Sequence, residues 1–290
     1  MCGIAGVFGA SDRPTVDAML TALHHRGPDD SFVVGGDRFD LGARRLSIVD
    51  VGGGRQPMSN ESQTIWAAQN GELYNYPLLR PRLLAAGHAL HTHCDTEVLP
   101  HLYEECGANL PQRIDGMFAV AVWDDARKVG LLARDRFGKK PLYYHVDRER
   151  LYFASEIKAL LRIPGFARRI DLEALHHFLS LKHVPQPHSI FQGIAQLPPA
   201  HRLVFEPGRP PQIERYWDLS FEADPDTAAL SEDELAERLL ALLRQGVERR
   251  LMADVPIGFF LSGGLDSSLT TALAAELSPR QIQTLQPILP

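Results

Sequence analysis

The sequence predicts an α+β domain with two stacked antiparallel sheets between helices, followed by the start of an α/β domain. Up to residue 205, many short strand-like runs alternate with few helices, a pattern that favours stacked sheets. Residues 206–212 are rich in proline and glycine and form a turn-rich connector. The continuous apolar run 255–261 is typical of a buried parallel strand, and a glycine-rich loop and a helical segment follow it.

Each element of the first domain follows from its local pattern. Helical spacing of apolar residues predicts helices at 14–25, 77–86 and 96–106, and a glycine closes each of them. The strand-like runs lie at 1–8, 32–34, 45–49, 65–69, 117–123, 129–133 and 151–154. The pair 117–123 and 129–133 predicts a hairpin.

The second domain opens on a helix start signal. Ser231 and Glu234 have the spacing of a capping box, and leucines at helical spacing continue to about Met252. The strand 255–261, the loop 262–268 and a helix at 269–277 come next. We therefore expect domains at 2–205 and 231–290, joined by a connector at 206–230.

Bulk composition excludes several classes of protein. A formal charge of −6 and a pI near 6.1 argue against a nucleic-acid partner, and the short basic run 134–140 is better explained as a solvated or substrate-facing turn. No apolar run approaches about 18 residues, so we expect no membrane partner. Three cysteines make no disulfide framework, which favours the cytoplasm.

Cys2 follows the initiator methionine directly. Its small side chain is compatible with removal of Met1, which would leave the thiol beside a free α-amine. The α-amine titrates near ~7.7–8.0 and the thiol near ~8.5, so the pair suits nucleophilic catalysis by an N-terminal residue. Taken alone, Cys2 is better explained as a small apolar residue at the start of a strand.

The loop after strand 255–261 is built for an anion. Gly263 and Gly264 let the backbone approach a phosphate, serines add hydroxyl donors, and the next helix points its amides at the same place. No lysine follows the glycines, so the loop is not the phosphate loop of kinases and GTPases. It is similar to the SGGxDS loop of enzymes that cleave ATP between its α and β phosphates.

Taken together and in order, these motifs resemble those of glutamine-dependent asparagine synthetases, from Cys2 to about Ser278. The resemblance implies a class II glutamine amidotransferase domain, with the four-layer αββα sandwich of N-terminal nucleophile hydrolases, and then an ATP-pyrophosphatase domain. The matching segments are 1–8 (MCGIAGVF), 25–29 (HRGPD), 45–50 (RLSIVD), 70–75 (NGELYN), 95–97 (DTE), 115–119 (DGMFA), 134–143, 154–159 (ASEIKA) and 262–268 (SGGLDSS).

The resemblance also implies the reaction. The first domain would hydrolyse glutamine to glutamate and ammonia, which would pass through an internal tunnel to the second. There it would amidate β-aspartyl-AMP made from aspartate, ATP and Mg²⁺. The partners would be these small molecules, and a homodimer is compatible with the resemblance.

Site residues carry over by position. Cys2 would be the nucleophile, and Asn70 with the backbone of Gly71 would form the oxyanion hole. Arg45 would bind the glutamine carboxylate as a two-donor guanidinium. The remaining assignments are Glu72 and Asp95 for the glutamine ammonium, Arg26 for the shape of the pocket, and Leu261, Ser262, Gly263, Gly264, Asp266, Ser267 and Ser268 for ATP.

Each residue alone has a simpler structural explanation. Arg45 could form a surface ion pair, and Asn70-Gly71 is a hairpin-turn signal between apolar runs. Asp95 could cap the helix that starts at Thr96. Their joint occurrence in order behind Cys2 favours the catalytic interpretation.

We expect no metal site from the sequence. His88, His91, His93 and Cys94 are close together, but the ligand-pair spacings of zinc modules are absent.

The chain departs from the family at its end. It stops 22 residues after Ser268, whereas a doubly wound domain needs several strands to bury its sheet. We therefore expect a truncated or frameshifted product or a fragment, with only glutamine hydrolysis intact and apolar faces exposed in the second domain. The alternatives are an amidotransferase of the same architecture for another carboxylate, and a non-catalytic glutamine-binding relic or regulatory subunit.

Overall fold

A computed structural model describes residues 2–222 and 224–286. The chain divides into two compact units between Asp218 and Leu219, here called unit 1 and unit 2. No helix of the described residues is long and apolar enough to cross a membrane.

Unit 1 holds two six-stranded sheets. The strands of the first sheet are, in spatial order, β10 (Ala195–Gln196), β8 (Tyr143–Asp147), β9 (Arg150–Ala154), β1 (Gly3–Phe8), β3 (Phe39–Arg45) and β2 (Asp30–Gly36). Those of the second are β12 (Gln212–Arg215), β11 (His201–Phe205), β7 (Val129–Arg134), β6 (Gly116–Asp124), β5 (Ile65–Leu73) and β4 (Met58–Ser59). The β6–β7 hairpin confirms the prediction for 117–133.

The core lies between the two sheets. Phe8 of β1 stacks on Trp123 of β6 with ring centroids 5.2 Å apart, and its ring is tilted against that of Phe153 of β9 at 4.8 Å. Leu132, Leu203 and other apolar residues from both sheets complete this cluster. Face-to-face packing of two half-apolar sheets is the expected way to bury them.

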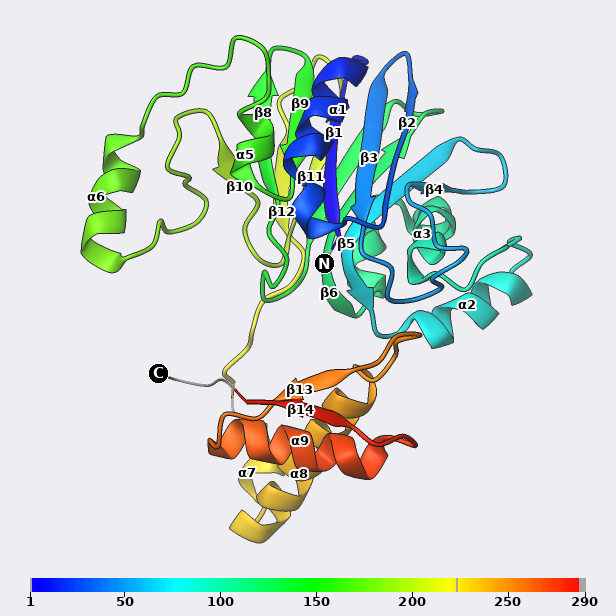
Figure 1. Cartoon of the computed structure of the whole chain (residues 1–290), viewed down its shortest axis with the longest axis vertical. Helices are drawn as coiled ribbons and strands as arrows, with labels where there is room; N and C mark the ends of the chain where they lie inside the picture. Colours follow the sequence, from blue (N-terminus) through cyan, green and yellow to red (C-terminus); the bar gives the residue numbers. More distant parts are fainter. Residues whose placement is uncertain (1, 223, 287–290) are drawn as a thin grey trace. The chain divides into compact units, whose positions relative to one another are not determined.

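Helices cover the outer faces of both sheets (Figure 1). On the first sheet, α1 (Arg13–Ala22) and α5 (Ile157–Leu160) pack against β1 and β9. On the second, α2 (Tyr76–Ala85) packs on α3 (Val98–Cys106), and α3 lies against β5. The predicted four-layer αββα sandwich is confirmed. The short helices are η1 (His24–Arg26), η2 (Asp95–Glu97), η3 (Gly107–Asn109) and α4 (Leu110–Arg113), and α6 (Leu172–Leu181) follows later in the chain.

The prediction of a strand at 45–49 was wrong. The strand is β3, which ends at Arg45 and pairs with both β1 and β2. Asp40 and Gly42 interrupt the apolar pattern of this strand, but the structure explains both. Asp40 accepts hydrogen bonds from the Ser11 hydroxyl at 2.8 Å and the Asp12 backbone N–H at 2.7 Å. A Cβ at Gly42 would lie 2.5 Å from Leu20 of α1, so glycine allows that helix to pack closely.

Residues 206–211 form the loop of a hairpin in the structure, and Gln212 begins the next strand. They join β11 to β12, and β12 adds an edge strand to the second sheet. The proline-rich stretch therefore lies within unit 1, and the unit boundary comes later than the expected start of a connector at 206.

The described part of unit 2 has three helices and a two-stranded parallel sheet. Helix α7 (Pro225–Ala228) precedes α8 (Glu232–Glu248), whose capping box at Ser231 and Glu234 is present as predicted. Strand β13 (Gly258–Phe260) is shorter than expected and largely exposed, and α9 (Leu265–Leu277) starts four residues before the predicted helix. A short strand, β14 (Gln283–Leu285), pairs with β13 where none was expected.

Candidate active site

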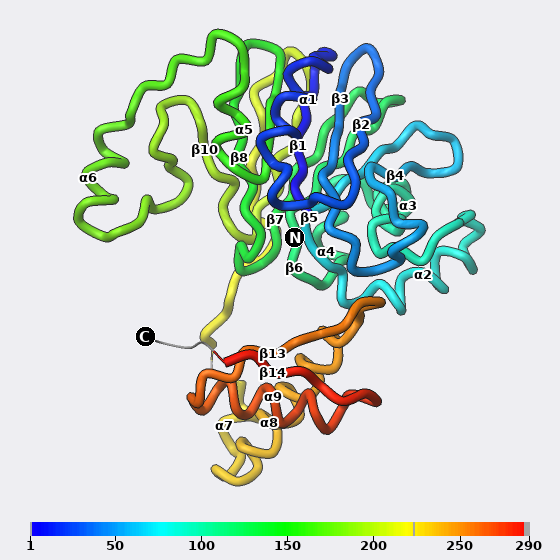
Figure 2. The backbone as a smooth tube through the Cα atoms, in the orientation of Figure 1, coloured from blue at the N-terminus to red at the C-terminus, as the bar shows by residue number. Residues whose placement is uncertain are grey.

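A cavity lies beside Cys2, at the end of the two sheets where β1 begins. The start of β1 lies next to β5 (Figure 2). The cavity has a volume of about 40 Å³. Its lining residues are Cys2, Arg45, Leu46, Ile48, Val49, Gln56, Asn70, Gly71, Glu72, Cys94, Asp95 and Lys140.

Cys2 contributes its thiol from the residue before β1. The Leu46 backbone N–H donates to the Sγ atom at 3.4 Å. Burial raises the pKa of the Cys2 thiol, while the Leu46 backbone and the charge of Arg45 oppose this rise. A thiol with a raised pKa is protonated at neutral pH, so it needs a base to become a nucleophile.

Asn70 and Gly71 lie inside β5, where both pair with β6. They are therefore not a hairpin turn. The Asn70 side chain is fully buried, and neither its Nδ2 nor its Oδ1 atom has a hydrogen-bond partner. Buried amides almost always find a partner, so an unpaired one at a cavity points to a ligand.

Gly71 is required by the close approach of β6. A Cβ atom here would clash with the backbone carbonyl of Met117. The register of β5 thus places a glycine next to Asn70 for a steric reason that is independent of catalysis.

Arg45 ends β3 and is buried, so it is not a surface ion pair. Its guanidinium donates to the backbone carbonyls of Val49, Asp50 and Val51 at 2.5–3.2 Å. These bonds hold the loop 46–56 as one wall of the cavity.

Two acidic residues face the same cavity. Asp95 is buried, and its Oδ2 atom accepts the Leu73 backbone N–H at 2.9 Å, so it joins η2 to β5 and does not cap a helix. Burial raises the pKa of Asp95, although the Leu73 bond opposes this. Glu72 lies half-buried on β5.

Arg26 is placed differently from the other predicted residues. It does not line the cavity. Its Nε atom donates to the Cys2 carbonyl at 3.0 Å and its Nη1 atom to Glu156 at 2.8 Å, so it fixes the start of β1. Arg26 acts on the cavity through the position of Cys2.

Lys140 lines the cavity and was missed by the sequence analysis as a site residue. Burial lowers the pKa of its ammonium group, and the nearby charge of Glu72 opposes this. The turn that carries Lys140 is built by Asp135, whose carboxylate accepts the backbone N–H groups of Phe137, Lys139 and Lys140 at 3.0–3.1 Å. The basic run 134–140 contained the signal for this residue, because its turn directs the Lys140 side chain into the protein.

The loop of unit 2 has the predicted strand–loop–helix context. Gly263 adopts φ +81°, which favours glycine, and Gly264 is the N-cap of α9. The Ser262 and Ser267 hydroxyls lie 3.0 Å apart, and Ser267 donates to the Gly264 carbonyl. The loop is largely exposed between a strand end and a helix N-terminus.

Comparisons with known proteins identify the family of the chain. Residues 1–217 match the family model described as glutamine amidotransferase domain, and residues 238–286 match the model described as asparagine synthase. The glutamine-hydrolysing asparagine synthetase 3 of Bacillus subtilis is 41% identical over 95% of this chain and 45% of its own length. An amidase of Penicillium rubens is 32% identical over 96% of this chain and 43% of its own length.

A solved structure supports the fold. The glutamine phosphoribosylpyrophosphate amidotransferase of B. subtilis aligns over 98% of this chain and 65% of its own, with a TM-score of 0.56 and 18% identity. The chain spans about 45% of the length of the B. subtilis synthetase.

Proposed function

Because the chain belongs to the family of glutamine amidotransferase domains, we propose that unit 1 hydrolyses glutamine to glutamate and ammonia at Cys2. The observation that carries this proposal is the buried, unpaired amide of Asn70 in the cavity that Cys2 lines. An amide donor held without a partner suits an oxyanion that forms during the reaction.

The proposed reaction begins after removal of Met1. The free α-amine of Cys2 takes the thiol proton, and the sulfur attacks the carboxamide carbon of the glutamine side chain. Asn70 Nδ2 and the Gly71 backbone N–H stabilise the oxyanion. The proton passes to the leaving nitrogen, which departs as ammonia, and water hydrolyses the resulting thioester to glutamate and free Cys2.

The remaining cavity residues would bind the substrate. Arg45 would hold the α-carboxylate of glutamine by two parallel donors. Glu72 and Asp95 would accept the α-ammonium. Arg26 would keep Cys2 in place, in agreement with its bond to the Cys2 carbonyl.

For unit 2 we propose the beginning of an ATP site within residues 231–290, with unit 1 as the glutaminase domain. Leu261, Ser262, Gly263, Gly264, Asp266, Ser267 and Ser268 would surround the phosphates of Mg-ATP. The ammonia from unit 1 would then amidate β-aspartyl-AMP to give asparagine. The match of residues 238–286 to the asparagine synthase model supports this assignment.

A second candidate is amidation of a different carboxylate. The similarity to a fungal amidase shows that relatives with other names share this sequence pattern. The first half-reaction, at Cys2, would be the same. We further propose a cytoplasmic location, since reducing conditions there would keep the Cys2 thiol free.

The test is glutamate release from glutamine by the purified chain, together with ATP–pyrophosphate exchange dependent on aspartate. Mass spectrometry first establishes that Met1 is absent. We expect release by the wild type and by Cys106→Ala, a control at the other half-buried cysteine, and none by Cys2→Ala. An intact Cys2 terminus without release would favour a non-catalytic glutamine-binding protein. Exchange without release would overturn the assignment of unit 1.

A further inference from the structure

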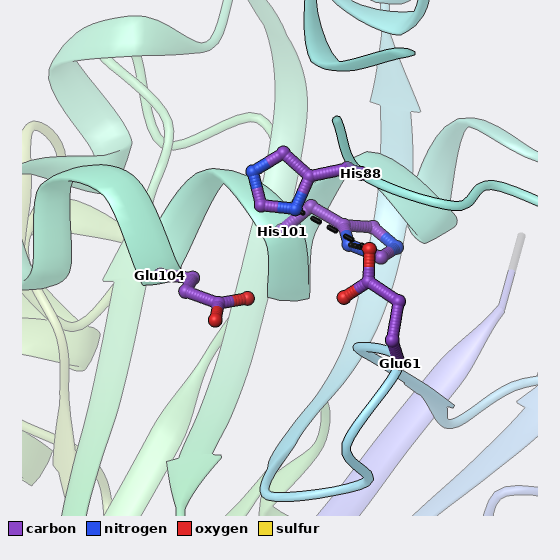
Figure 3. A group of neighbouring side chains, drawn as sticks. All are labelled: Glu61, His88, His101 and Glu104. Carbon is purple, nitrogen blue, oxygen red and sulfur yellow. Dashed lines mark ion pairs between the residues drawn. The ribbon is translucent and has the colours of Figure 1, made fainter. Parts of the chain in front are cut away.

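Four metal-ligating side chains meet on the outer side of the second sheet, away from the cavity lining. They are Glu61 in the β4–β5 turn, His88 in the α2–α3 loop, and His101 and Glu104 on α3. One ligand atom from each lies within 4.8 Å of the others. Figure 3 shows the four side chains pointing toward a common centre. His101 and Glu104 share a helix face because they are three residues apart.

His101 has the environment of an unoccupied ligand. Its side chain is 1% exposed, and neither ring nitrogen has a hydrogen-bond partner. Its Nδ1 atom lies 3.3 Å from Glu61 Oε1, but this contact does not have hydrogen-bond geometry. An unpaired buried polar group costs folding free energy, and a bound cation would offset this cost.

The distances suit a small divalent cation. His88 Nδ1 lies 3.4 Å from Glu61 Oε1, close to the 3.3 Å of the His101 contact. Ligand atoms at about 2.0–2.2 Å from a tetrahedral Zn²⁺ lie roughly 3.3–3.5 Å from one another. Two imidazoles with two carboxylates are a donor set that zinc accepts.

Outer partners orient the ligands. His88 Nε2 faces Glu105 at 3.8 Å, as in the carboxylate–histidine–metal arrangement. The Ala89 backbone N–H donates to Glu61 Oε1 at 2.6 Å, and Asn60 Nδ2 donates to Glu104 Oε2 at 3.3 Å. Such outer partners fix the ring and carboxylate positions that a metal needs.

We propose that Glu61, His88, His101 and Glu104 bind one Zn²⁺ ion. The ion would connect the β4–β5 turn to α3 and to the loop that runs from His88 to Cys94 and Asp95, two residues of the cavity wall. Its role is structural, because four protein ligands leave no open position on a tetrahedral ion. The sequence analysis did not find this site because its ligands come from three elements. His91, His93 and Cys94 are not part of it.

The experiment measures Zn²⁺ binding to the chelator-treated full chain by competition with a chromophoric chelator. A Cys2→Ala background removes the catalytic thiol as an alternative ligand. We expect one equivalent of Zn²⁺, and at least about 100-fold weaker binding in His101→Gln and in Glu104→Gln, since loss of outer partners alone costs 10–100-fold. His91 is an exposed histidine of the same loop, so the His91→Gln control should bind Zn²⁺ as tightly as the background protein does.

Two further readouts keep the proposal falsifiable. Co²⁺ in the same site should give the visible absorption of a tetrahedral ion. Glu104→Gln should lose this absorption, and because Glu104 is exposed, misfolding would not explain the loss. Zn²⁺ should raise the Tm of the background protein and of His91→Gln in a concentration-dependent way, but not that of Glu104→Gln. Absence of stoichiometric binding, or binding unchanged in both ligand variants, would overturn the site. Neither result depends on glutamine hydrolysis.

Discussion

At the scale of single residues, two similarly buried asparagines differ in their hydrogen-bond partners. Asn60 is 2% exposed, and its Oδ1 atom accepts the backbone N–H groups of Thr64 and Ile65 at 3.0 Å. Asn70 is 0% exposed and its amide has no partner. The first residue therefore contributes to the fold, whereas the second carries a desolvation cost that only a bound species offsets.

Asn70→Ala should separate catalysis from stability. Loss of one oxyanion donor is expected to lower kcat for glutamine hydrolysis by about 10²–10³. The free energy of unfolding should not fall, because no hydrogen bond is lost and an unpaired buried amide is removed. Kinetics and urea unfolding measure the two effects.

Asn60→Ala is the matched control and should do the opposite, with a loss of about 1–3 kcal/mol of stability and near-normal kcat. If Asn70→Ala unfolds as easily as Asn60→Ala and keeps its kcat, the oxyanion role is wrong.

Asp95→Asn should change how stability depends on pH. Burial raises the pKa of folded Asp95, so the folded state holds its proton more tightly than the unfolded state, where the pKa is about 3.9. The stability that protonation gives to the wild type is complete below pH ~3.9 and is lost as pH rises through the folded pKa. The stability of the variant relative to the wild type should therefore rise over that window.

Urea unfolding of both proteins from pH 3.5 to 7 measures this difference, and other carboxylates cancel in it. Asp125→Asn gives a control of opposite sign. Burial opposes ionisation of Asp125, but the hydrogen bonds from Lys128 and Trp123 outweigh this effect and lower its pKa. If the stability of Asp95→Asn relative to the wild type fell as pH rises, the burial argument would be contradicted.

We also expect Asp95→Asn to have a higher KM for glutamine than the wild type.

At the scale of elements, strand β5 does most to form the cavity. Its second half carries Asn70, Gly71 and Glu72, and β6 pairs along its whole length. An Asn-Gly pair in a strand is unfavourable by propensity. The tight approach of the Met117 backbone explains the glycine, and the cavity explains the asparagine.

Gly71→Ala should damage the β5–β6 pair. The added Cβ meets backbone that cannot rotate away, so we expect a loss of about 1–3 kcal/mol or more in the free energy of unfolding. Gly52→Ala is the control, because nothing lies within 4 Å of its Cβ position. Equal denaturation midpoints for the two variants would show that β6 moves easily.

At the scale of the whole molecule, the two units differ in how well they bury their apolar residues. Unit 1 has two large buried clusters. In unit 2, Leu242 is 59%, Phe260 76% and Leu265 83% exposed, and the buried side chains of its helices are Leu273 and Ala274 of α9. Exposed apolar surface of this kind promotes association.

A chain that ends after Asp218 should therefore bind much less of the dye ANS than the full chain. It should also keep a single cooperative unfolding transition, since the buried clusters lie in unit 1. Dye fluorescence and circular dichroism check both points. Equal dye binding by the two proteins would place the exposed apolar surface in unit 1.

Much of the fold followed from local patterns. The β6–β7 hairpin, the capped helix α8 and the glycine loop before α9 are set by residues adjacent in the chain. Strand β3 was not found, because a central strand can contain Asp40 and Gly42 when its neighbours require them. The short strand β14 depends in the same way on its partner β13.

The sequence by itself determined the order of the motifs, the candidate nucleophile Cys2 and the family to which unit 1 belongs. Tertiary structure decided which of these residues share a cavity, placed Arg26 behind Cys2 and Lys140 inside, and assembled the Glu61–His88–His101–Glu104 cluster. The reason is physical. Periodicity reports the neighbours of a residue along one element, whereas a cavity or a ligand cluster depends on sheet register and helix packing between elements distant in sequence.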